Sequence, residues 1–142
     1  MPDRPVRDVM HTGVISCPPE TGLHEVAMIM RERRISAVVV MRDGRAVGII
    51  SQTDLVNASF IQPYLRYWGG MAARHLMTAP VITVAADAPL GQALALLTTH
   101  RIHRLVVTEP TDDGERPVGI LSLTDVARAL ADARSAPTES PS

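Results

Sequence analysis

Two stretches of the sequence, Gly48-Ile49-Ile50-Ser51-Gln52-Thr53-Asp54 and Gly119-Ile120-Leu121-Ser122-Leu123-Thr124-Asp125, follow one pattern. Each has a glycine, two aliphatic residues and then Ser-x-Thr-Asp, and each runs into a segment with helical spacing. Aliphatic residues favour a buried strand. Ser, Thr and Asp favour the start of a helix, because their oxygens accept the free N–H groups of the first turn. We therefore predict two strand-to-helix corners, each with two hydroxyls and a carboxylate.

Such a corner has two interpretations. In the first, it is only a helix cap, which is a common local structure. In the second, it is a binding site, where a helix N-terminus offers N–H donors and partial positive charge to an anion. A single copy would favour the cap, whereas two copies in a matched context favour a ligand-binding site.

The duplication extends well beyond the corners. Nine residues of the first half recur 67 positions later, and after the first predicted hairpin the offset becomes 71. The recurring residues are Arg7, Met10, Val14, Ile15, Leu23, Arg34, Ile35, Val39 and Val40, found again at 74, 77, 81, 82, 90, 101, 102, 106 and 107. The change of offset predicts a second turn, over residues 108–117, that is four residues longer, polar and at the surface. An internal repeat is thus the main organising feature of the chain.

Each repeat is predicted to run strand, helix, strand, strand, helix. In the first repeat these are a short strand at 14–17, a helix at 23–33 capped by Thr21 or Gly22, and strands at 36–41 and 47–51 around a turn at 42–45. A helix then runs from Thr53 to about Phe60. One such unit would leave an apolar sheet face uncovered, so the two repeats should pack together.

Composition excludes several classes of function. The net charge is −1, from 14 basic and 15 acidic residues, so the basic excess of a non-specific nucleic-acid binder is absent. No apolar run reaches the roughly 18 residues of a membrane span, and residues 1–5 do not resemble a signal peptide. These features predict a cytoplasmic protein. Cys17 is the only cysteine, which excludes an internal disulfide and favours a small core residue.

The duplicated pattern resembles a CBS-domain pair, also called a Bateman module. The resemblance rests on VRDVM (6–10) and ARHLM (73–77), the order of elements and both Ser-x-Thr-Asp corners. It implies an α/β (α+β) fold with two small three-stranded sheets and flanking helices in a pseudo-twofold arrangement. The first motif would span 6–58, an aromatic linker 59–72 and the second motif 73–130, with a disordered tail at 135–142.

The resemblance also implies that clefts between the two motifs bind adenosyl compounds: AMP, ADP, ATP or S-adenosylmethionine. The corner Asp would accept the two ribose hydroxyls, since one carboxylate has two acceptor oxygens. The Ser and Thr before it would lie beside phosphate. The first cleft would join one corner to the second repeat, through Ile49, Ser51, Thr53, Asp54, Val81, Ile82, Arg101, Ile102, His103 and Arg104. HRIHRLVV (100–107) is similar to a stretch of the gamma subunit of AMP-activated protein kinase, where the His-Arg pair contacts phosphate.

The second cleft departs from the first. It would join the other corner to the first repeat, through Ile120, Ser122, Thr124, Asp125, Val14, Ile15, Ser36 and Ala37. Ser36-Ala37 stands where His103-Arg104 stands in the first cleft, so two possible phosphate contacts are missing. It would still hold a nucleoside end, or a phosphate through Ser36 and the helix terminus. The two clefts are therefore predicted to be unequal.

Two other functions are weaker. His100 and His103 lie at metal-ligand spacing, but the segment leaves a helix and no acidic or cysteine partner is near in sequence. Phosphate-loop and nucleophile-elbow motifs of enzymes are absent. The resemblance therefore implies a regulatory, non-catalytic module that requires no cofactor, binds an adenine nucleotide and modulates an unidentified partner. The alternative is a structural or dimerisation module without a nucleotide.

All four aromatic residues fall in the linker: Phe60, Tyr64, Tyr67 and Trp68. Phe60, Tyr64 and Trp68 would form one stripe on a helix, although Pro63 interrupts a continuous one. The stripe either covers the core of the module or forms a self-association surface. We expect a homodimer with Tyr67 or Trp68 at or beside the contact, because aromatic residues are enriched at interface centres.

Overall fold

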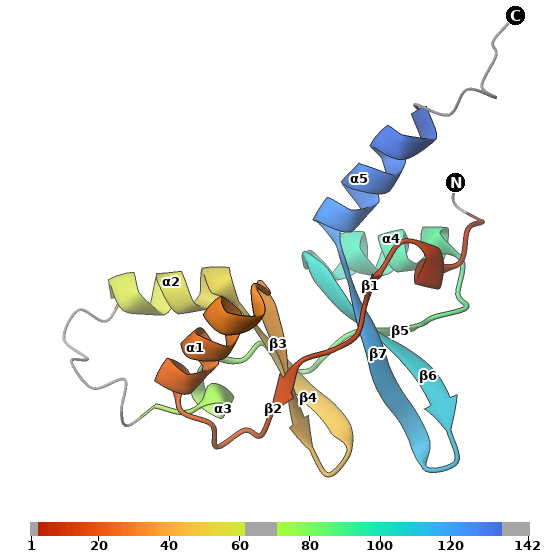
Figure 1. Ribbon diagram of the computed structural model, residues 1–142. Helices are drawn as coiled ribbons and strands as arrows, with labels where there is room; N and C mark the ends of the chain where they lie inside the picture. The colour runs from red at the N-terminus through yellow and green to blue at the C-terminus, as the bar shows by residue number, and fades with distance from the viewer. Residues whose placement is uncertain (1–2, 62–70, 135–142) are drawn as a thin grey trace, which may run out of the picture. The chain divides into compact units, whose positions relative to one another are not determined.

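The computed structural model describes residues 3–61 and 71–134, which belong to two compact units (Figure 1). One consists of residues 14–81 and is called here the three-stranded unit; the other consists of residues 1–13 and 82–142 and is called the four-stranded unit. The predicted mixed fold, with two small sheets and flanking helices, is confirmed. Residues 62–70 of the linker, the side chain of Phe60 and the tail at 135–142 lie outside the described part.

The three-stranded unit follows the predicted order of elements. It contains β2 (Ser16–Cys17), α1 (Leu23–Arg33), β3 (Ala37–Arg42), β4 (Arg45–Ser51), α2 (Gln52–Ile61) and α3 (Ala73–Leu76). Strand β3 is central, parallel to β2 and antiparallel to β4. Helix α1 begins and ends where the sequence predicts, with Gly22 as its cap. Its buried Leu23, Val26 and Met30 recur at helical spacing and pack in one core cluster with Val38 and Ile50 of the sheet.

The four-stranded unit repeats this order. It contains η1 (Val6–Asp8), β1 (His11–Thr12), β5 (Thr83–Ala85), α4 (Leu90–His100), β6 (Arg104–Thr111), β7 (Gly114–Ser122) and α5 (Leu123–Arg134). The strand order is β1-β7-β6-β5. Leu90, Leu97, Leu105 and Leu121 are buried in its core cluster. The sequence predicts three strands here, and β1 is the fourth.

The extra strand belongs to what is called here a leading segment, the residues of a repeat that come before its first predicted strand. Strand β1 comes from the first repeat, yet it pairs with β7 of the second, with His11 opposite Ile120. In the three-stranded unit, Thr78 of the second repeat pairs with Ile49 of the first. Thr78 lies 67 residues after His11, so the two pairings are equivalent. Each unit therefore includes the leading segment of the other repeat.

The two hairpins differ in length and in the backbone of their turns, since in the second turn only Gly114, at its end, has positive φ (130°). Asp43 and Gly44 both have positive φ, 52° and 78°, as a tight two-residue hairpin turn requires. In the second repeat the predicted long surface turn over 108–117 is wrong. Strands β6 and β7 stay paired out to Thr111 and Gly114, so the four extra residues lengthen the strands. Polar cross-strand contacts support this extension: Arg116 lies 3.7 Å from Glu109, and the Thr108 hydroxyl donates to Glu115 over 3.1 Å.

Candidate functional site

The first predicted corner is a capping box at the start of α2. The backbone N–H of Asp54 donates to Ser51 Oγ over 3.2 Å, and the backbone N–H of Ser51 donates to Asp54 Oδ2 over 2.8 Å. Ser51 is buried, Asp54 half-buried and Thr53 exposed. The two reciprocal bonds satisfy two backbone donors at the helix terminus. The cap interpretation of the Ser and Asp is therefore correct for the local geometry.

The second corner repeats this geometry at the start of α5. Asp125 N–H donates to Ser122 Oγ over 3.1 Å, and Ser122 N–H donates to Asp125 Oδ2 over 2.9 Å. Thr124 is exposed, like Thr53. In both corners the backbone of the serine therefore holds Oδ2 and orients the carboxylate. A ligand hydroxyl would find a carboxylate whose direction is already set.

The aliphatic residues before the corners are held by the exchanged leading segments. Ile49 donates its N–H to the Thr78 carbonyl over 3.2 Å and accepts the Thr78 N–H over 2.9 Å. Ile120 stands opposite His11 in the equivalent pairing. Both isoleucines are half-buried. Each isoleucine places an apolar side chain two residues before the serine and five residues before the aspartate of its corner.

Within each unit, the corner lies beside the start of the preceding strand of its own repeat. Ala37 is opposite Ser51, and Gln52 N–H donates to the Ser36 carbonyl over 2.8 Å. In the other unit, Arg104 is opposite Ser122, and Leu123 N–H donates to the His103 carbonyl over 3.1 Å. The corner with Asp125 thus adjoins the His-Arg pair within its own unit.

The predicted clefts join residues of different units, so the pairing of Asp54 with His103-Arg104, and of Asp125 with Ser36-Ala37, stays a prediction. Val14 and Ile15 are half-buried beside β3, where Ile15 accepts the Val39 N–H over 3.0 Å. Val81 and Ile82 are half-buried as well, and Ile82 accepts the Val106 N–H over 3.2 Å. Ile15 and Ile82 therefore bond to β3 and β6 of their own units.

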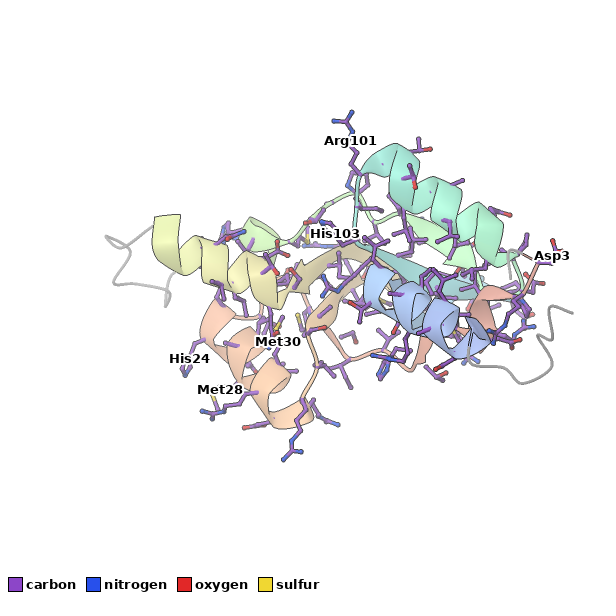
Figure 2. All side chains as sticks on the ribbon, turned by 90° about the horizontal axis from the view of Figure 1, so that it is seen from above. Asp3, His24, Met28, Met30, Arg101 and His103 are labelled. Carbon is purple, nitrogen blue, oxygen red and sulfur yellow. The ribbon has the colours of Figure 1, made fainter. Side chains whose placement is uncertain are left out.

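Arg34 and Arg101 end the equivalent helices α1 and α4. Both adopt the left-handed conformation, with φ of 55° and 53°, and their N–H groups bond the last helical carbonyls. This C-terminal cap is usually a glycine. Figure 2 shows Arg101 extending away from the end of α4. Both residues therefore act as helix caps through their backbone.

His100 is the last residue of α4, and His103 is exposed just before β6. Among the described residues, no three His, Cys, Asp or Glu side chains gather as a metal site would require. In the same part of the chain, no helix is long and apolar enough to cross a membrane.

A groove between α1 and α2 was not predicted. Its volume is about 600 Å³, and its lining residues are Ala27, Met30, Arg31, Gln52, Thr53, Leu55 and Val56. Figure 2 shows Met30 on the side of α1 that faces α2, with His24 and Met28 pointing away. The sequence signal that could have indicated this groove is the spacing of Ala27, Met30 and Arg31, which places them on one face of α1. Thr53, predicted to lie beside phosphate, also borders this groove.

Cys17 is a core residue, as predicted, with 4% of its surface exposed. Burial raises the pKa of its thiol, and the charge of Glu25 acts in the same direction, whereas a hydrogen bond with Thr21 opposes them. The thiol therefore stays protonated at neutral pH.

Comparison with known proteins shows which family this chain resembles. The CBS domain family matches residues 6–60 and 73–132. An uncharacterised protein of Methanopyrus kandleri is 32% identical over 122 residues, 85% of this chain and 60% of that protein. The gamma-3 subunit of human 5′-AMP-activated protein kinase is 27% identical over 107 residues, 72% of this chain and 21% of the subunit. The chain thus spans less than two thirds of both relatives.

Two solved structures resemble this chain over most of its length. An uncharacterised conserved protein from Pyrococcus horikoshii is 27% identical, with a TM-score of 0.75, over 92% of this chain and 94% of that one. CBSX2, solved in complex with AMP, is 26% identical, with a TM-score of 0.69, over 92% of this chain and 98% of that one.

Proposed function

Because this chain belongs to the CBS-domain family and carries two tandem copies of the domain, we propose that it is a regulatory, non-catalytic module that binds an adenine nucleotide. The observation that carries the proposal is the matched pair of corners. In both, a serine N–H holds Oδ2 of an aspartate at 2.8 or 2.9 Å and so orients the carboxylate at a helix N-terminus. AMP in the similar structure of CBSX2 supports an adenosyl ligand.

The chemistry of the corners suits a nucleotide. An ionised carboxylate accepts hydroxyl hydrogen bonds strongly, and a ribose offers two neighbouring hydroxyls. The exposed hydroxyls of Thr53 and Thr124 lie in the first turn of α2 and α5, where N–H groups and the helix dipole favour phosphate. The half-buried Ile49 and Ile120 would contact the base. AMP, ADP, ATP and S-adenosylmethionine share the adenosine part of this ligand.

The regulatory step would be a shift between two arrangements of the module or of its dimer, transmitted to a partner protein. The size of the shift is limited by the difference in ligand affinity between the arrangements. We also propose a homodimer in the cytoplasm. Apolar side chains exposed on α5 support self-association: Leu123 is 45% exposed, and Leu130, seven residues further along the helix, is 54% exposed.

Titration calorimetry with AMP, ADP, ATP and S-adenosylmethionine tests the proposal. At least one should bind at sub-millimolar concentration, and Asp54→Asn or Asp125→Asn should weaken it. Asparagine keeps an oxygen for the serine N–H, so the cap survives while the charge is lost. Chemical unfolding of each variant checks that the fold is intact. Absence of heat with all four ligands would reject the proposal.

The alternative is an assembly module without a nucleotide. The capping boxes favour it, because they give Ser51, Asp54, Ser122 and Asp125 a structural reason to be present. In that case the aspartate variants would change stability alone, and no adenine nucleotide would bind.

A further inference from the structure

The two corners differ in the neighbour of the second carboxylate oxygen. At Asp125, Oδ1 lies 3.6 Å from Nη1 of Arg128, one turn further along α5. The equivalent position of the first repeat, 71 residues earlier, is Asn57. Within residues 3–61 and 71–134, no ion pair involves Asp54. The corner with Asp125 therefore has an arginine side chain beside its carboxylate, and the corner with Asp54 has an asparagine at the equivalent position.

This ion pair engages the oxygen that a ribose hydroxyl would use. Oδ2 of Asp125 already accepts the Ser122 N–H, so Arg128 leaves neither carboxylate oxygen without a partner. The Asp125 side chain is 13% exposed, whereas that of Arg128 is 68% exposed. The guanidinium thus reaches a half-hidden carboxylate from the solvent side. A ligand hydroxyl must share Oδ1 with Arg128 or displace it.

In either case the guanidinium of Arg128 stays close to the ligand, where it favours a ligand that carries phosphate. It has five N–H donors in a planar fork, and phosphate oxygens accept two of them at once. An uncharged nucleoside meets the competition for Oδ1 and gains nothing from the cation.

We propose that Arg128 is a specificity-determining residue that makes the Asp125 corner select phosphate-bearing adenine nucleotides over adenosine. The inference rests on the proposed function, and Arg128 is not among the binding residues predicted from the sequence.

The test compares the affinities for AMP and adenosine in a background of Asp54→Asn, which weakens the other corner. Arg128→Gln should lower the ratio of AMP to adenosine affinity about threefold to fivefold, the range of an exposed charge contact. Arg116→Gln is the matched control, because Arg116 is 67% exposed in the same unit and pairs with Glu109 instead. The control should leave the ratio unchanged. High salt should shrink the effect of Arg128→Gln, since exposed charges are screened.

The reciprocal substitution gives an independent test. Asn57→Arg, combined with Asp125→Asn, should raise the ratio of AMP to adenosine affinity at the corner with Asp54. An unchanged ratio in Arg128→Gln, or an equal loss in Arg116→Gln, would overturn the role of Arg128 while leaving nucleotide binding in place. A wild-type protein that binds neither ligand would overturn the proposed function itself. Loss of all AMP binding in Asp54→Asn alone would also overturn the inference, because the Asp125 corner would then hold no nucleotide.

Discussion

The side chain of Met77 occupies the space where a Cβ atom on Gly48 would stand. Gly48 belongs to the first repeat and Met77 to the leading segment of the second. The equivalent pair in the other unit is Met10 and Gly119, where the sulfur of Met10 lies 2.8 Å from the ideal Cβ position. The glycine of each corner motif is thus required by close packing. Neither glycine is among the positions with positive φ.

This packing predicts that alanine at either glycine destabilises the fold. Gly48→Ala and Gly119→Ala should each cost about 1–3 kcal/mol in unfolding free energy, the usual cost of overpacking. The cost should be larger at Gly119, because a Cβ there also meets the His11 carbonyl oxygen at 2.5 Å, which is backbone. Urea unfolding of the two variants measures the difference.

A double-mutant cycle distinguishes the two sites. Met77→Ala should partly restore the stability of Gly48→Ala, since it removes the two nearest atoms. Met10→Ala should restore less at Gly119, where the carbonyl remains. Equal rescue in both units would show that the leading segments adjust freely.

The capping boxes predict that serine and threonine of each corner have separable roles. Ser51→Ala and Ser122→Ala should each lower the unfolding free energy by about 0.5–2 kcal/mol, the cost of a lost helix cap. Thr53→Ala and Thr124→Ala remove exposed side chains and should change it by less than about 0.5 kcal/mol. If the threonines face phosphate, their variants should instead weaken AMP binding. Threonine variants that lose stability but keep full affinity would contradict this division.

The buried thiol predicts a loss of stability in alkaline solution. The pKa of Cys17 is raised in the folded protein, so its contribution is fully present below the ordinary thiol pKa. The contribution is lost as pH rises through the raised pKa of the folded state. The chain contains no lysine, which leaves few other side chains titrating there. The unfolding free energy should therefore fall as pH rises above the ordinary thiol pKa, and less so in Cys17→Ala. Identical pH profiles would contradict burial of the thiol.

The two clefts are predicted to differ in the affinity for phosphate. Asp54→Ala and Arg104→Ala should each weaken AMP more than Asp125→Ala does, because charge-assisted contacts are the stronger kind. Arg104→Ala should leave adenosine affinity nearly unchanged. Calorimetry with AMP and adenosine measures all three variants. Equal losses would reject the asymmetry, and a nucleotide found in a crystal only at Asp125 would reverse it.

The aromatic linker predicts a homodimer with Tyr67 or Trp68 at the contact. Sedimentation of the wild type at tens of micromolar should give a dimer, and Trp68→Ala should shift it toward the monomer. A variant that stays dimeric but melts at a much lower temperature would place Trp68 in the core instead. A wild-type monomer at that concentration would reject the dimer.

Some of the candidate site followed from local chemistry. Ser51 and Asp54 are three residues apart, and so are Ser122 and Asp125, so each pair forms its hydrogen bonds within one turn of chain. Helix α1 likewise followed from the spacing of Leu23, Val26 and Met30. Such interactions need no knowledge of distant residues. The contact between Arg128 and Asp125 is equally local, but i,i+3 charge pairs are common on helices and by themselves indicate no function.

The sequence by itself determined the duplication, the order of elements and the two caps, because residue spacing and backbone hydrogen-bonding chemistry act over a few residues. Only the tertiary structure decided that the leading segments are exchanged, with Thr78 on Ile49 and His11 on Ile120. It also decided that four extra residues lengthen β6 and β7 rather than the turn. The physical reason is that a strand edge accepts any segment with suitable backbone donors and acceptors. The choice among segments distant in sequence is made by side-chain packing, such as that of Met77 on Gly48 and Met10 on Gly119.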